Sequence, residues 1–171
     1  MSCTACATRL SWSEGPEPAI SGGRTVSSTA VRALLAKGQV EAAARLLGRP
    51  YEISGRIVRG RKRGRLLGYP TANLHTANEI LPDGVYVSET LRGGPPHPSV
   101  TSIGTNPTFG VNPLTVETLL LDYRGSLYGS EITIRLLRRL RPSRAFKDAQ
   151  ALAEAIRRDV NDARAWFAKR G

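Results

Sequence analysis

The chain has 171 residues, of which 40% are hydrophobic and 23% are charged, a balance typical of one compact globular domain in solution. No apolar run approaches the ~20 residues needed to cross a bilayer, and the N-terminus lacks the pattern of a signal peptide, so we expect a cytoplasmic protein. The net charge of +11 favours a polyanionic partner, whether a nucleic acid, a phosphorylated ligand or an acidic membrane surface, without choosing among them.

The first fifty residues predict a leader followed by two short helices. Residues 1–26 are rich in Ser, Gly, Pro and Thr without sustained periodicity, so we expect a largely disordered leader. Apolar residues at helical spacing then predict helices over 30–37 and 40–47, which Gly38 and Gly48 end. Such a helical hairpin has an apolar seam that needs another surface to pack against.

From Tyr51 onward the pattern changes to short strands separated by turns. Several strands at short spacing, without crossover helices between them, favour an antiparallel barrel over a doubly wound sheet. After the strands, apolar residues at helical spacing predict a C-terminal helix over 145–169, with Ser143 as a plausible cap. The predicted strands cover residues 53–58, 85–90, 99–103, 116–122 and 131–137.

The strongest local signal is a basic loop rich in glycine, residues 60–68. A loop of this kind brings backbone N–H groups against phosphate oxygens while arginines add positive charge. It is not a Walker A loop, because no Gly-Lys-Ser/Thr opens a helix here. Beyond it, Thr71 and Asn73 place a hydroxyl and an amide oxygen on the same side of an extended segment, and such oxygens suit magnesium. Alone, the sequence Pro-Thr-Ala-Asn is a turn in most proteins.

A carboxylate, Glu117, interrupts a predicted strand that is otherwise apolar through Leu121. It is either a residue on the polar, outer side of the strand or a functional group, and taken alone the surface interpretation is favoured. A loop rich in Gly and Pro, residues 102–110, either shapes the wall of a pocket or is only a long hairpin connection.

Taken together and in order, these segments resemble the riboflavin kinase family from about Tyr51 to Phe167. So many matches in the same order are not expected by accident. The matching residues are Gly60, Gly64-Arg65, Leu67 to Leu74, Gly84 to Tyr86, Ser102 to Phe109, Val116 to Thr118, Leu121 to Tyr123, Leu127 to Gly129, Leu140 to Pro142, Phe146 and Asp159.

The resemblance implies a mainly β fold, a six-stranded antiparallel Greek-key barrel with a C-terminal helix. It also implies transfer of the γ-phosphoryl group of ATP to the terminal ribityl hydroxyl of riboflavin, which gives FMN and ADP. Glu117 matches the catalytic base, and Thr71 and Asn73 match the positions that hold Mg²⁺ with the nucleotide. The other implied site residues are Gly60, Arg65 and Tyr128 on the nucleotide side, and Leu120, Asp122, Arg141, Arg144 and Phe146 around the flavin.

The segment before the barrel resembles the end of the adenylyltransferase module of bacterial bifunctional FAD synthetases. Residues 27–50 would then be a helical remnant of that module, and residues 51–171 the kinase domain. Fewer than thirty residues precede Ser27, and the sequence has no His-x-Gly-His motif, so we expect no adenylylation of FMN. The expected partners are riboflavin and ATP, bound by a monomer without a membrane or nucleic acid.

Three residues depart from the family pattern: Leu119 stands where relatives often have His, and Arg124 and Ser126 replace residues that are often acidic. They are neither the implied base nor the implied metal ligands, so we expect activity to survive and leave flavin affinity open. One alternative is a non-catalytic relative that binds a flavin or nucleotide. The other is a nucleic-acid-binding barrel, which the absence of an aromatic pair beside the arginine clusters disfavours.

Overall fold

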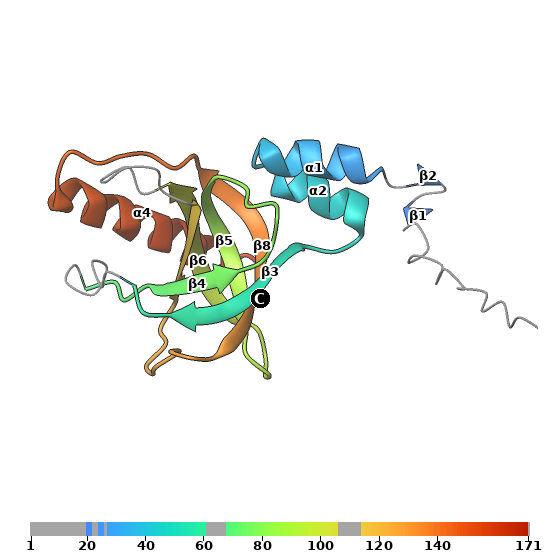
Figure 1. Cartoon of the computed structure of the whole chain (residues 1–171). Coiled ribbons are helices and arrows are strands. Elements are labelled where there is room, and N and C mark those ends of the chain that lie inside the picture. The colour runs from blue at the N-terminus through green and yellow to red at the C-terminus, as the bar shows by residue number, and fades with distance from the viewer. Residues whose placement is uncertain (1–19, 22–23, 26, 61–67, 106–113, 171) are drawn as a thin grey trace, which may run out of the picture.

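Six antiparallel strands close into a barrel at the centre of the computed structural model, which describes residues 20–21, 24–25, 27–60, 68–105 and 114–170 (Figure 1). Around the barrel the order is β3-β4-β7-β6-β5-β8. Because β8 returns to lie beside β5, the first strand of the β5–β6–β7 meander, this is the predicted Greek-key arrangement. The strands are β3 Tyr51–Val58, β4 Ala72–Thr76, β5 Gly84–Leu91, β6 His97–Thr105, β7 Leu114–Leu120 and β8 Glu131–Arg141.

All five strands predicted from alternation are present, with small differences at their ends. The alternation does not single out β4, which continues the expected extended segment at Thr71 and Asn73 as far as Thr76. The strand β7 ends at Leu120 rather than at Asp122, because Asp122 adopts a φ of 56°, in the left-handed region that ends a regular strand.

The helical hairpin is present over the predicted residues, as α1 Ser28–Ala36 and α2 Val40–Leu47. Ser27 caps α1 by accepting a hydrogen bond from the Ala30 amide, and Gly48 ends α2 with a φ of 69°. In the leader, β1 Ile20–Ser21 pairs with β2 Arg24–Thr25. The other leader residues lie outside the described ranges, so the predicted disorder of 1–26 stays a prediction.

The hairpin finds its packing surface on one end of the barrel, beside β3 and β8 (Figure 1). Leu35, Val40 and Ala43 are buried in the same hydrophobic cluster as the barrel-interior side chains Ile53 and Ile134. Burying this seam is favourable in proportion to the apolar area removed from water. Residues 27–50 therefore share a core with residues 51–171, whatever the origin of the hairpin.

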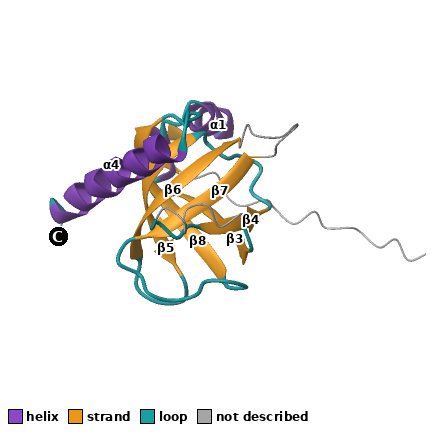
Figure 2. Cartoon of the chain, turned by 90° about the vertical axis from the view of Figure 1, so that its left-hand side faces the viewer, coloured by secondary structure: helices purple, strands orange, loops and turns teal. Residues whose placement is uncertain are grey.

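A long C-terminal helix, α4 Ala149–Ala168, lies across the outside of the barrel (Figure 2). It begins four residues later than predicted, at 149 rather than 145, because the Asp148 side chain accepts a hydrogen bond from the Ala151 amide at 2.7 Å and caps it. Val160 and Ala163 of α4 pack on outward-facing side chains of the strands, among them Val85 and Leu119. Within the described ranges no helix is both long and apolar enough to cross a membrane.

Part of the barrel interior is polar. Five hydroxyl side chains on β5, β6 and β7 are buried, and hydrogen bonds of 2.7–3.0 Å join them into one network. A buried hydroxyl without a hydrogen-bond partner would cost free energy. Because these hydroxyl groups bond to one another, this part of the barrel interior can be polar rather than filled by apolar side chains. The five residues are Ser88, Thr90, Ser99, Thr101 and Thr118.

Candidate active site

The register of β4 against β7 brings three predicted site residues together on the outer face of the barrel. Asn73 on β4 lies directly opposite Glu117 on β7. The neighbouring Ala72 and Thr118 form the next pair and face the interior, so Asn73 and Glu117 point outward. Just before β4, Thr71 donates a hydrogen bond from Oγ1 to Glu117 Oε2 at 3.1 Å. Residues 46 positions apart in the chain thus share one site.

Gly60 touches the amide of Asn73. A Cβ atom at residue 60 would overlap the Nδ2 and Cγ atoms of that amide, so any other residue here would require the Asn73 side chain to move. The predicted phosphate loop, residues 60–68, therefore begins in contact with the Asn73 side chain. Arg65, in the middle of that loop, lies outside the described residues.

Two of these side chains, Thr71 and Asn73, suit a hard divalent cation. They offer a hydroxyl and an amide oxygen, and magnesium accepts few such protein ligands when it takes the rest from phosphates and water. The carboxylate of Glu117 lies beside them. Among the described residues there is no group of three His, Cys, Asp or Glu that would make a self-contained metal site. The oxygens of Thr71 and Asn73 fit a cation that takes its other ligands from a phosphate group and water.

Glu117 belongs to a row of cross-strand partners that runs around the barrel, and the side chains of this row point outward. The pairings Val58–Asn73, Asn73–Glu117, Glu117–Ser102, Ser102–Val85 and Val85–Arg141 are continuous across all six strands. Adjacent strands lie ~4.8 Å apart, so each step along the row is short. In sequence, Ser102 is only part of a loop motif, and the register is what places this exposed hydroxyl beside Glu117.

Near the Asn73 end of the row lies Tyr128, one of the exposed large hydrophobic side chains of the described residues. The Gly129 amide donates a hydrogen bond to the Ile57 carbonyl at 3.0 Å, which holds the loop with Tyr128 against β3. Val58, the next residue of β3, is also exposed. Val58, the first residue of the row, and Tyr128 therefore place exposed apolar surface at the Asn73 end.

The residues predicted to surround the flavin fall into two groups. Arg141, Arg144 and Phe146 are together, because both guanidinium groups lie over the Phe146 ring, at 5.5 and 5.0 Å from its centroid. Leu120 packs against the interior cluster of the barrel instead. Asp122 is exposed and forms an ion pair with Arg164 of α4 at 2.6 Å. The structure does not bring these last two side chains together with the first three.

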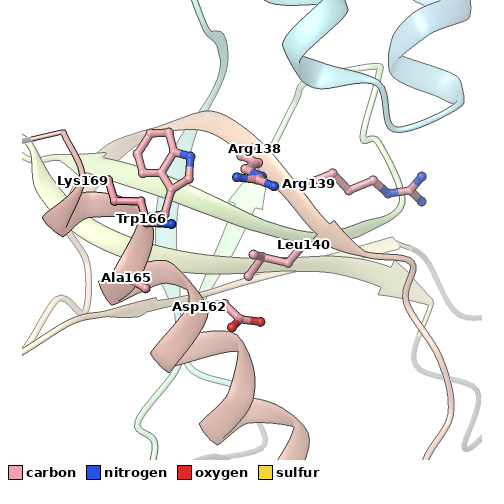
Figure 3. Close-up of a pocket in the computed structure, with 7 residues that line it drawn as sticks. All are labelled: Arg138, Arg139, Leu140, Asp162, Ala165, Trp166 and Lys169. Atoms are coloured by element: carbon pink, nitrogen blue, oxygen red, sulfur yellow. The ribbon is translucent and has the colours of Figure 1, made fainter.

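A shallow groove of about 300 Å³ lies elsewhere, between β8 and the C-terminal end of α4 (Figure 3). Its lining includes Arg138, Leu140, Trp166 and Lys169. The labelled Arg139 side chain points away from Trp166, and its guanidinium instead donates hydrogen bonds to the Lys37 and Asp83 carbonyls. No predicted site residue lines this groove.

The family model and the curated relatives agree on one family. The family model for riboflavin kinase (Flavokinase) matches residues 47–167. The bifunctional riboflavin kinase/FMN adenylyltransferase of Escherichia coli K12 is 41% identical over 85% of this chain and 47% of its own length. The corresponding protein of Listeria monocytogenes is 37% identical over 84% of this chain and 47% of its own. The chain thus spans about half the length of these curated relatives.

Two solved structures have a similar fold. A riboflavin kinase from Trypanosoma brucei matches with a TM-score of 0.50 and 26% identity, over 70% of this chain and 81% of that one. A Streptococcus pneumoniae protein described as a macrolide-efflux protein matches with a TM-score of 0.77 and 31% identity, over 87% of this chain and 50% of that one. The fold is a closed, six-stranded antiparallel barrel like that of the riboflavin kinase. The chain belongs to the riboflavin kinase family.

Proposed function

We propose that this chain transfers the γ-phosphoryl group of ATP to the terminal ribityl hydroxyl of riboflavin, giving FMN and ADP, and that it does not adenylylate FMN. The observation that carries the proposal is the order of residues in the outward row. Asn73, which the family resemblance assigns to the nucleotide, lies directly opposite Glu117, and Arg141, which the resemblance assigns to the flavin, stands at the other end of the row. A base between two substrate sites is where proton removal is needed when phosphoryl transfer begins.

In the proposed reaction Glu117 accepts the proton of the ribityl hydroxyl as that oxygen bonds to the γ-phosphorus. The bond from the γ-phosphorus to the β–γ bridging oxygen breaks, and ADP leaves with that oxygen. A divalent cation bound with ATP, held by Thr71 and Asn73, would supply neutralisation of phosphate charge. The expected gain from the base alone is about 10²–10⁴-fold in rate.

Thr71 links the base to the nucleotide side. An ionised carboxylate only accepts hydrogen bonds, so the Thr71 hydroxyl must direct its proton to Glu117 Oε2. Its oxygen lone pairs then point away from Glu117, where they are available to a cation. One hydroxyl thereby orients the base and contributes an oxygen ligand.

Ser102 extends the row from Glu117 toward the flavin end. Its side chain is exposed and lies opposite Glu117 in the β6–β7 pair. Cross-strand neighbours have Cβ atoms ~5 Å apart, close enough for one bound polyol chain to contact both. We assign Ser102 to contact with the ribityl hydroxyls.

The test is FMN formation by the purified chain with riboflavin, ATP and Mg²⁺, compared between wild type and Glu117→Gln. The variant should bind ATP normally and lose about 10²-fold or more of its turnover. Glu131→Gln, an exposed carboxylate at the start of β8, is the matched control and should keep full turnover.

Flavin binding without FMN formation by the wild type would instead identify a non-catalytic relative. Near-normal turnover of Glu117→Gln would remove Glu117 as the base. Formation of FAD from FMN and ATP would contradict the second half of the proposal.

A further inference from the structure

Asp159 of α4 is buried and forms a bidentate ion pair with Arg141. The side chain of Asp159 is only 8% exposed. Arg141 Nε lies 2.9 Å from Asp159 Oδ1, and Arg141 Nη2 lies 2.8 Å from Asp159 Oδ2. A planar guanidinium matched to a carboxylate in this way is among the strongest and most directional polar contacts in proteins. The Arg141 head group is thus held by α4.

Arg141 also sets the start of the connection between β8 and α4, residues 142–148. Its Nη1 donates to the Pro142 carbonyl at 3.3 Å, and its guanidinium lies over the Phe146 ring. Arg144 lies over the same ring, but its side chain is exposed. The two arginines therefore differ, because Arg141 is engaged with the fold while Arg144 stands at the surface.

A second contact holds the same connection from the barrel side. The Ser143 hydroxyl donates to Asp83 Oδ1, just before β5. Gly104 of β6 lies beneath both residues, because a Cβ there would be 3.0 Å from Ser143 Cβ and 3.2 Å from Asp83 Oδ1. The connection is therefore fixed at its beginning by α4 and by the β4–β5 loop.

We propose that Asp159 is a positioning residue, which acts through Arg141 to hold residues 142–148 in place against the flavin, while the exposed Arg144 makes the direct contact with it. This inference rests on the proposed function. It assigns Arg141 to the support of the flavin site rather than to ligand binding. Groups that hold a substrate-binding segment in its productive geometry influence turnover and affinity without touching the substrate.

The first measurement needs no substrate. Arg144 and Lys147 are trypsin sites inside the connection, whereas the Arg141–Pro142 bond resists trypsin, so cleavage between 144 and 148 reports on this segment alone. Asp159→Asn should be cut there faster than wild type, as followed by mass spectrometry. Glu52→Gln is the matched control, because it removes one carboxylate charge from an ion pair with Arg135 on the same strand β8, at 2.8 Å. It should leave cleavage at 144–148 unchanged.

The second measurement separates the two substrates. Asp159→Asn should raise the KM for riboflavin roughly tenfold, because the flavin segment is loosened. The KM for ATP should stay within about twofold, since the Asn73 end of the row is untouched. Arg144→Ala should also raise the riboflavin KM but leave the tryptic pattern of the remaining site, Lys147, as in wild type.

Arg141→Lys keeps the positive charge but not the planar fork, and it carries the test if Asp159→Asn does not fold. It should show the same faster cleavage and the same selective rise in riboflavin KM. Unchanged cleavage at 144–148, or equal rises in both KM values, would overturn the positioning role. If wild type forms no FMN, the proposed function fails, and the proteolysis comparison still decides whether Asp159 anchors the connection.

Discussion

Thr71 Oγ1 lies 3.1 Å from Glu117 Oε2, and this contact joins the residue before β4 to the middle of β7. The contact exists because Asn73 and Glu117 are direct cross-strand partners, which fixes the distance between the two segments. In the proposed reaction it orients the base before substrate arrives.

Replacement of Thr71 tests this contact. Thr71→Val removes the hydroxyl at nearly constant volume, so Glu117 loses its donor and the nucleotide side loses an oxygen ligand. We expect kcat to fall by about 10²-fold. Thr71→Ser retains the hydroxyl and should keep most of the activity. Steady-state kinetics of FMN formation give the comparison, and equal activity of the Val and Ser variants would show that the hydroxyl has no role.

Gly60→Ala should act on the nucleotide rather than on the flavin. The new methyl group overlaps the amide of Asn73, so that side chain must move from its position beside Glu117. We expect the KM for ATP to rise roughly tenfold while the KM for riboflavin changes much less. Gly94→Ala is the control, because a Cβ there has nothing within 4 Å. A rise in the riboflavin KM alone would contradict the placement of Gly60 at the nucleotide.

The hydroxyl network inside the barrel should contribute to stability. Thr101 bonds with both Ser88 and Thr118, at 2.7 and 3.0 Å, and all three are fully buried. Thr101→Val keeps the shape but leaves these two partners each short of a bond, which we expect to lower the free energy of unfolding by about 1–3 kcal/mol. Urea unfolding measures the change.

Thr133→Val is the control for this network, because the bond from Thr133 to Ser54 is exposed and water can replace it. Its cost should stay below about 0.5 kcal/mol. Equal losses of unfolding free energy in the two variants would mean that burial does not make the network's hydrogen bonds more stabilising than an exposed one.

Much of the fold follows from local sequence features. Gly48 ends α2 where the sequence predicts, since its left-handed conformation favours glycine. By contrast, β4 is missed from alternation, because only Leu74 among its five residues is buried and its partners on β3 and β7 hold it as a strand. The hairpin is predicted without its partner surface, because the packing of Leu35 against the barrel depends on tertiary structure.

In the site, too, some residues are identified from the sequence and others only from the tertiary structure. Thr71, Asn73 and Glu117 are found through the resemblance, whereas the row that places Ser102 beside Glu117 requires the strand register. The pair of Arg141 with Asp159 joins residues 18 apart, across the end of a strand and half of a helix, and no local pattern predicts such a contact. The roles of these residues stay predictions until the variants are measured.

Tyr86 provides a test of the barrel end beneath the hairpin. It is fully buried, and its hydroxyl donates to the Asp83 carbonyl at 2.9 Å. Burial raises the pKa of Tyr86 from 10.0 to about 12, against the opposing effect of the Arg139 guanidinium. The unfolded chain therefore loses this proton near pH 10, whereas the folded chain keeps it until about pH 12. Because the unfolded state binds fewer protons in this window, stability is complete below pH 10 and falls as the pH rises toward 12.

Tyr86→Phe removes the titrating group and leaves the ring. Loss of the bond to Asp83 should lower its free energy of unfolding by about 1 kcal/mol at neutral pH. Between pH 10 and 12 the wild type should then lose up to about 2–3 kcal/mol more than the variant, as the shift of its pKa requires. Urea unfolding of both proteins at about pH 8 and about pH 11.5 measures the difference, and all other titrations cancel because both chains share them. Parallel stability curves would mean that the Tyr86 hydroxyl reaches water, and hence that the hairpin does not seal this end of the barrel.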